Sequence, residues 1–421
     1  MVFRRRRILA CLRRFACPDV FRPLTSGLWL LTALLILAGC VTAPPANPVV
    51  RRTGDPVVDD QARLATAPPQ DRVLWEYRVA AAALRRGQYD EARAQLDAAL
   101  KTAEGILGTT GPETEAAAAR GRFHQEAGKP FVGEPYERVM AGFYRGILYW
   151  QDGEPDNARA LFRSGGFIAG GTGGKSPEGG WVLADYLDGL VTAKLHGDGS
   201  DALARARARS AHPLPDYDPA ANVLVLAEYG AGPLKYAAGQ YGEQLKFYSS
   251  APPTVTDARL AVAGQTFDLA PWDDVGLQAT LRGGTVMDQI RDNKAEFKQA
   301  TDLAGDVLLA GGAAVAVAGR GRRSGEAAIG LLAAGVTSKL ASVATQPAAD
   351  TRAWDNLPRY LSFAALRLPP GAHPATLTFY DPSGRPLPNP QVFSITVPAP
   401  AAGPSAPPPS DTIVFRSALT N

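Results

Sequence analysis

The chain has 421 residues, of which 20% are charged and 46% hydrophobic, and this balance excludes a wholly disordered or fibrous protein. Four histidines and three cysteines offer little material for a metal cluster or a disulfide framework, so we expect no metal and no cofactor. The formal charge of +3 arises from a basic N-terminus, which contains Arg4, Arg5, Arg6, Arg7, Arg13, Arg14 and Arg22.

The N-terminus has the pattern of a secretory signal peptide, which we place at residues 1–39. A basic stretch precedes an apolar run from Leu28 to Leu37, which is too short to span a bilayer stably. Ala38 and Gly39 are the small residues that a lipoprotein signal peptidase accepts before a cysteine. The pattern therefore predicts that Cys40 is acylated; an uncleaved anchor helix is the alternative.

The predicted mature chain is mildly acidic and carries no free thiol. Cleavage before Cys40 removes Cys11 and Cys17 and leaves 37 basic against 40 acidic residues. This balance gives no support to nucleic-acid binding. Val41 follows the cysteine in place of an aspartate, which favours the outer membrane, facing the periplasm. Residues 40–71 are rich in proline and lack periodicity, so we expect a flexible tether.

Residues 72–210 have helical spacing and are predicted to form a repeat domain. Gly87, Ala92 and Leu96 are spaced as a turn and the second helix of a helix–turn–helix pair. The same spacing recurs at Gly153, Ala158 and Phe162, with a weaker echo at Gly197, Ala202 and Ala206. These units resemble degenerate tetratricopeptide repeats, and three pairs are about the minimum for a stable solenoid.

Residues 220–397 are predicted to form a smaller domain of mixed helix and strand. Strand patterns occur at 223–228, 244–248, 259–262, 266–269, 360–368, 376–380 and 392–397, and a helix is expected from 274 toward 301. The Ala/Gly-rich residues 303–344 suit a helical hairpin, buried or docked on the surface, with contact to the membrane surface as the alternative. Residues 398–421 are predicted as a Pro-rich linker followed by an edge strand at 412–415. The expected fold class is therefore α+β, with helical repeats first and an antiparallel sheet after them.

Three blocks of sequence carry a family resemblance. They are Gly128–Met140 (GKPFVGEPYERVM), Glu228–Lys235 (EYGAGPLK) and Ala349–Pro358 (ADTRAWDNLP), with Leu368–Gly371 (LPPG) added to the last. In this order they resemble a family of bacterial lipoproteins that has tetratricopeptide-like repeats and no assigned activity. The resemblance implies a periplasm-facing lipoprotein and brings no catalytic residues with it.

The block at Gly133–Met140 has two interpretations. In one, Pro135 opens a helix whose apolar face includes Tyr136, with Glu134 and Arg138 spaced for an ion pair on its surface. In the other, Lys129, Glu134, Tyr136 and Arg138 ring a concave groove that binds a partner peptide.

Three further patterns are candidates for chemistry. Ala169–Ser176 fits a relaxed phosphate loop, but no strand precedes it and Pro177 interrupts the required helix, so we expect an inter-helix loop and no nucleotide. His124 stands near Glu126 without a recognisable catalytic order. Asp350, Arg352 and Trp354 precede a strand, where we expect them to lock a turn, with a ligand site as the alternative.

These observations together predict a non-enzymatic, lipid-anchored envelope lipoprotein whose repeat domain binds or scaffolds another envelope protein. An envelope hydrolase acting on peptidoglycan and a structural spacer between membrane and wall are the two alternatives.

Overall fold

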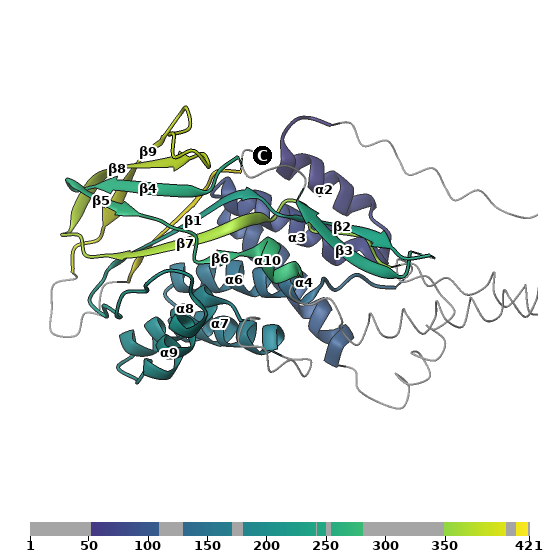
Figure 1. Ribbon diagram of the computed structural model, residues 1–421, viewed down its shortest axis with the longest axis horizontal. Coiled ribbons are helices and arrows are strands. Elements are labelled where there is room, and N and C mark those ends of the chain that lie inside the picture. The colour runs from purple at the N-terminus through teal and green to yellow at the C-terminus, as the bar shows by residue number, and fades with distance from the viewer. Residues whose placement is uncertain are drawn as a thin grey trace, which may run out of the picture. The chain divides into compact units, whose positions relative to one another are not determined.

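The structure is a computed structural model that describes residues 52–108, 129–170, 180–240, 242–249, 254–280, 349–400 and 410–419. Residues 50–421 form one compact unit. The predictions on the signal peptide, Cys40, His124, Lys175 of the phosphate-loop pattern and the hairpin at 303–344 fall outside the described residues. Helices and strands both contribute, so the α+β class is confirmed (Figure 1).

The described helices pack mainly on their neighbours in the chain. They are α2 (Pro56–Thr66), η1 (Pro69–Asp71), α3 (Arg72–Arg85), α4 (Tyr89–Gly108), α6 (Pro135–Gln151), α7 (Pro155–Gly170), α8 (Val182–Lys194), α9 (Ser200–Arg209) and α10 (Val275–Thr280). Helix α3 packs on α4, α6 on α7, and α8 on both α7 and α9.

The helix–turn–helix spacing read from the sequence is confirmed at the first two pairs. Gly87 and Gly153 adopt left-handed φ values of 71° and 80°, which glycine reaches without steric cost, and α4 and α7 begin two residues later. Ala92 and Ala158 are buried on the second helix of each pair. At the third pair the left-handed residue is His196, with φ 64°, not Gly197.

Part of the expected tether is helical, which corrects the prediction for residues 40–71. Asp55 caps α2 by accepting a hydrogen bond from the Val57 backbone N–H at 2.9 Å, and Pro56 occupies the first helical position. Val57 is buried, and Asp60 pairs with Arg78 of α3 at 3.2 Å. Asp55 and Pro56 are typical of a helix start, but the prediction for this segment relied on its lack of periodicity.

The strands form two four-stranded sheets and a hairpin. The first sheet has the order β10 (Thr412–Ser417), β1 (Val223–Ala231), β7 (Pro358–Leu366), β6 (Asp273–Asp274). The second has the order β5 (Gln265–Asp268), β4 (Asp257–Val262), β8 (Gly371–Tyr380), β9 (Gln391–Val397). The hairpin consists of β2 (Pro233–Ala238) and β3 (Gln244–Ser249).

The predicted strands are present, with two corrections. The terminal strand β10 is at the sheet edge, as expected, but it pairs parallel to β1, whereas all the other described pairs are antiparallel. The strand patterns include no strand at 233–238, yet Pro233 begins β2 there. A proline is compatible with the first residue of a strand because the position needs no ladder N–H.

Strand β1 joins the two parts of the chain that the sequence suggested were separate domains. Leu224 and Leu226 belong to a core that also holds buried residues of the helices, whereas Val223 and Val225 belong to the core between the two sheets. Because successive side chains of a strand point to opposite faces, β1 is covered on both sides, and its sequence is apolar from Val223 to Ala227. In Figure 1 the helices lie along β1 and β7. The residues on either side of 210–220 therefore share one core.

Candidate binding site

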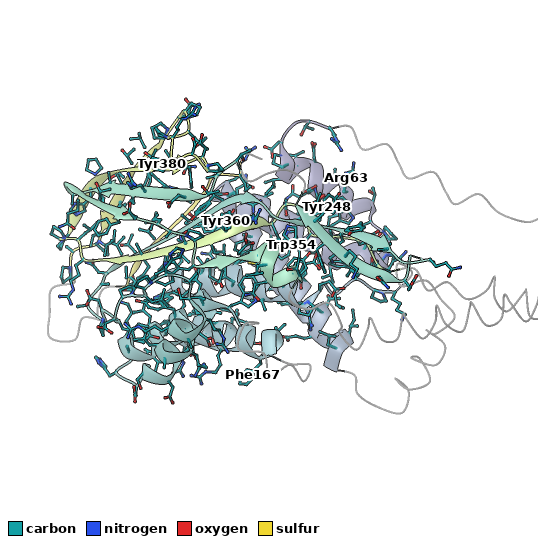
Figure 2. All side chains as sticks on the ribbon, viewed as in Figure 1. Arg63, Phe167, Tyr248, Trp354, Tyr360 and Tyr380 are labelled. Atoms are coloured by element: carbon teal, nitrogen blue, oxygen red, sulfur yellow. The ribbon has the colours of Figure 1, made fainter. Side chains whose placement is uncertain are left out.

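The three blocks of the family resemblance meet at one buried carboxylate. Glu137 of α6 accepts hydrogen bonds from Lys235 Nζ at 2.6 Å and from the Trp354 backbone N–H at 2.8 Å. Its Oε2 also accepts from the Glu134 backbone N–H at 2.6 Å, as part of a capping box. Trp354, labelled in Figure 2, is fully buried and stacks on Tyr77 of α3 with ring centroids 4.6 Å apart. One side chain thus connects α6, β2 and the segment before β7.

Lys235, the partner of Glu137, is also buried, with its side chain 2% exposed. Lys235 Nζ also donates to the Arg352 carbonyl at 3.0 Å, and the rings of Phe131 and Tyr136 lie 5.3 and 5.7 Å from it. A buried ion pair is tolerated only when further hydrogen bonds satisfy both groups, and here they do so. The Lys235 ammonium therefore links β2 to α6 and to the segment before β7.

Arg352 connects the segment before β7 to the first helices. Its guanidinium pairs with Asp350 at 2.6 Å and with Asp71 at 2.7 Å, and it donates to the Gln70 and Lys129 carbonyls. The expectation that Asp350 and Arg352 lock this turn is confirmed, and the lock extends to η1 and the chain before α6.

A second buried carboxylate joins β1 to the helices. Glu228 accepts from Arg85 Nε of α3 and from the Tyr144 hydroxyl of α6, each at 2.5 Å. Both acidic and basic side chains are almost fully buried. Burial, and the nearby Glu228 carboxylate, raise the pKa of Tyr144 well above its ordinary value, so the phenol stays protonated as a donor. Among the charged residues of the blocks, Glu137, Lys235 and Glu228 therefore hold helices to strands, and Arg352 holds the segment before β7 to η1.

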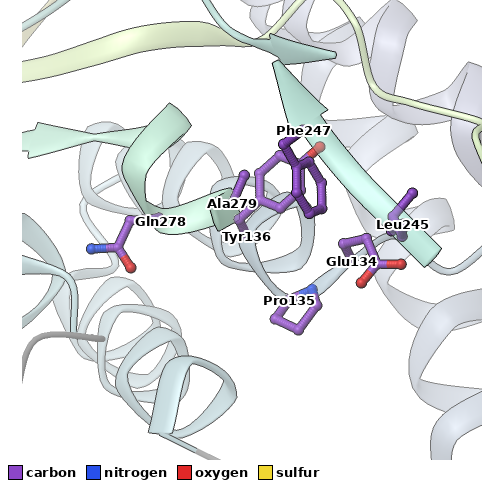
Figure 3. Close-up of a pocket in the computed structure, with 7 residues that line it drawn as sticks. All are labelled: Glu134, Pro135, Tyr136, Leu245, Phe247, Gln278 and Ala279. Atoms are coloured by element: carbon purple, nitrogen blue, oxygen red, sulfur yellow. The ribbon is translucent and has the colours of Figure 1, made fainter. Parts of the chain in front are cut away.

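Of the four residues expected to ring a partner groove, two line the same hollow. Tyr136 is only 3% exposed, and its ring packs edge-on against Phe247 with centroids 5.7 Å apart. Glu134 and Tyr136 line the same small hollow, shown in Figure 3, whereas Lys129 and Arg138 are not among its lining residues. The apolar face of α6 places Tyr136 inward against β3, and the groove made of all four residues stays a prediction.

A larger cleft, of about 300 Å³, borders the same hairpin. It is lined by Ala231, Gly232, Pro233, Phe247, Tyr248, Asp274, Gly276, Leu277, Thr280 and Arg359. Tyr248 is 48% exposed and Leu277 52% exposed, so the cleft presents apolar surface to solvent. The sequence analysis did not single out either residue, although an aromatic side chain on the solvent face of a predicted strand was a usable signal.

The Asp273 carboxylate caps the N-terminus of α8, the described helix that follows the Gly-rich segment. The backbone N–H groups of Val182 and Leu183 donate to the Asp273 carboxylate at 2.9 and 2.8 Å. A phosphate bound at the start of a helix would need these same backbone N–H groups, which here already donate to Asp273. Burial raises the pKa of Asp273 to about 6, although both hydrogen bonds oppose this. Helix α7 extends to Gly170, and α8 begins only at Val182, so neither helix starts at Lys175.

Within the described residues, no three His, Cys, Asp or Glu side chains are placed to hold a metal ion. Over the same part of the chain, none of the helices has the length and apolar character needed to cross a bilayer.

Comparison of the chain with known protein families, with curated proteins and with solved structures finds no match.

Proposed function

We propose that this chain is a lipid-anchored lipoprotein of the outer membrane, facing the periplasm, that acts by binding another envelope protein and not by catalysing a reaction. The anchor rests on the Leu37-Ala38-Gly39-Cys40 motif after a basic and apolar N-terminus. We also propose that the three helical pairs are tetratricopeptide-like repeats, on the strength of their Gly and Ala spacing.

One observation carries the binding part of the proposal. The charged residues Glu137, Lys235 and Glu228 form buried ion pairs inside the protein. Tyr248 and Leu277, in contrast, line a cleft that is open to solvent. Exposed apolar surface in a hollow favours recognition of another molecule, because its burial on binding is the main source of affinity.

The anchor is tested by Cys40→Ser. Metabolic labelling with a radioactive fatty acid and fractionation of cells should show that the variant carries no label and leaves the membrane fraction. Leu37→Val is the matched control, since it keeps the motif apolar at that position and should stay labelled. Continued labelling of Cys40→Ser would remove the anchor from the proposal.

A further inference from the structure

Three hydrogen bonds join the start of α8 to a strand and a helix that come much later in the chain. The Asp273 carboxylate of β6 accepts from the Val182 and Leu183 backbone N–H groups at 2.9 and 2.8 Å. Gln278 of α10, whose amide points away from the other labelled residues in Figure 3, donates to the Gly180 carbonyl at 3.0 Å. We call these five residues the α8–β6 contact.

The residue next to Asp273 connects this contact to the solvent-exposed cleft. Asp274 immediately precedes α10 and accepts from the Leu277 backbone N–H at 3.0 Å, so it caps that helix. Its other oxygen accepts from Arg359 of β7 at 3.3 Å. Asp274, Leu277 and Arg359 all line the cleft. Two successive carboxylates therefore cap two helices, α8 in the interior and α10 beside the cleft.

The Asp273 carboxylate is buried among like charges. The residue is only 4% exposed, and the carboxylates of Asp185 in α8 and Asp274 in β6 both act on it. The arginines of the adjoining elements pair with these two neighbours: Arg205 and Arg209 of α9 with Asp185, and Arg359 of β7 with Asp274. The phenols of α8 and β7 stay neutral because burial raises the pKa of Tyr186 and of Tyr360. A charged Asp273 is therefore costly in the closed structure.

The two protonation states of Asp273 affect the contact differently. A neutral carboxyl group is compatible with burial and keeps oxygen lone pairs for the backbone N–H groups of α8. An ionised carboxylate loses its hydration there and regains it when the start of α8 separates locally from β6. We infer that the α8–β6 contact is a proton-controlled latch, which stays closed while Asp273 is protonated and opens locally more often once Asp273 has lost its proton. The latch is a property of the fold and depends on neither the lipid anchor nor a partner.

The direction of the effect follows from proton linkage. The pKa of Asp273 is raised to about 6 in the closed contact, and in the open contact water returns it toward the ordinary 3.8. The stabilisation of the closed contact is complete below about pH 3.8 and is lost as pH rises through about 6. Between about pH 4.5 and about pH 7.5 the opening equilibrium should therefore increase about twentyfold.

Amide hydrogen exchange of the intact protein in detergent measures this opening. The Val182 and Leu183 amides should exchange faster than the Leu148 amide of α6 and should be insensitive to about 1 M urea, because local opening exposes little surface. Their protection factors should fall about twentyfold from about pH 4.5 to about pH 7.5. In Asp273→Asn the fall should be less than threefold. Asp274→Asn is the matched control, since it removes the adjacent charge, and it should keep a fall of at least tenfold.

A carboxyl titration in the wild type makes the test independent of how the variants fold. The side-chain carboxyl carbon of Asp273, followed by NMR, should titrate with a midpoint of about pH 6, together with the change in exchange at Val182. A midpoint at the ordinary 3.8, or protection of Val182 and Leu183 that does not change with pH, would overturn the inference. It would also be overturned if these amides exchanged at the rate and with the urea sensitivity of Leu148, because α8 would then open only with the whole fold. A twentyfold fall that persists in folded Asp273→Asn would assign the effect to another group and overturn it equally.

Discussion

Lys235 Nζ lies 2.6 Å from Glu137 Oε2, and these two buried side chains are 98 residues apart in the sequence. The pair connects the first strand of the hairpin to the start of α6, and Glu137 extends the connection to Trp354. Charged residues in motifs are often taken as candidates for chemistry. Here their burial and full hydrogen bonding assign them to the joint between helices and strands.

Breaking this pair should be strongly destabilising. Lys235→Met leaves the Glu137 carboxylate buried without its counter-charge, which typically costs about 3–5 kcal/mol. Asp268→Asn is the control, since it removes one partner of an exposed pair with Arg259 and should cost under about 1 kcal/mol. Chemical denaturation measures both. Similar small losses from the two variants would contradict the role given to Glu137 and Lys235.

The Tyr144 hydroxyl should contribute to stability through Glu228. Tyr144→Phe removes one hydrogen bond to a buried carboxylate, and such bonds are worth about 1.5–3 kcal/mol. Tyr248→Phe, at an exposed ring, should change the free energy of unfolding by under about 0.5 kcal/mol. Equal effects of the two hydroxyl deletions on the free energy of unfolding would contradict this role of Tyr144.

The close approach of α6 and α7 should not tolerate a methyl group. A Cβ at Gly146 would lie 2.7 Å from the buried ring of Phe162, so Gly146→Ala should cost about 1–3 kcal/mol. Gly105→Ala is the matched control, because a Cβ there meets no atom within 4 Å and the residue lies in helix α4. That change should stabilise by about 0.5–1 kcal/mol. A Gly146→Ala variant as stable as the wild type would show that the two helices are packed less closely.

Asp273 should make stability fall as pH rises through mildly acidic values. Its folded-state pKa of about 6 exceeds the ordinary 3.8, so the folded protein holds the proton more tightly than the unfolded chain. The resulting stabilisation is complete below about pH 3.8 and is lost as pH rises through about 6. The free energy of unfolding of the wild type minus that of Asp273→Asn should therefore decrease by about 2 kcal/mol between about pH 4.5 and pH 7.5. An increase over this range would contradict the direction of the pKa shift.

Local sequence patterns predicted most of the helices and strands, but they did not predict contacts between residues far apart in the sequence. The spacing of Gly87 and Ala92 predicted a turn and a helix because both constraints act within one helical pair. The burial of Glu228 was not predicted, because its partner Arg85 lies 143 residues away and an isolated glutamate normally faces solvent. The parallel pairing of β10 was missed for the same reason, since its neighbour β1 lies far earlier in the chain.

The candidate site was predicted only in part. Glu134 and Tyr136 were expected at a groove and do line the hollow of Figure 3, but the direction of Tyr136 follows from the packing of α6 on β3. Leu277 fell within a predicted helix, and helical spacing alone does not determine whether such a residue is covered. Its exposure depends on the hairpin and Arg359, which come from other parts of the chain.

The most direct test of the lipid-anchored binding role is photo-crosslinking in living cells. A benzoylphenylalanine at position 277 should give a crosslinked product with a second protein in the membrane fraction, and Cys40→Ser should abolish it. The same group at position 107 should give no such product. A product of equal yield from both positions, or none from position 277 in an acylated and folded protein, would contradict the proposal that this chain binds an envelope partner through the cleft lined by Tyr248 and Leu277.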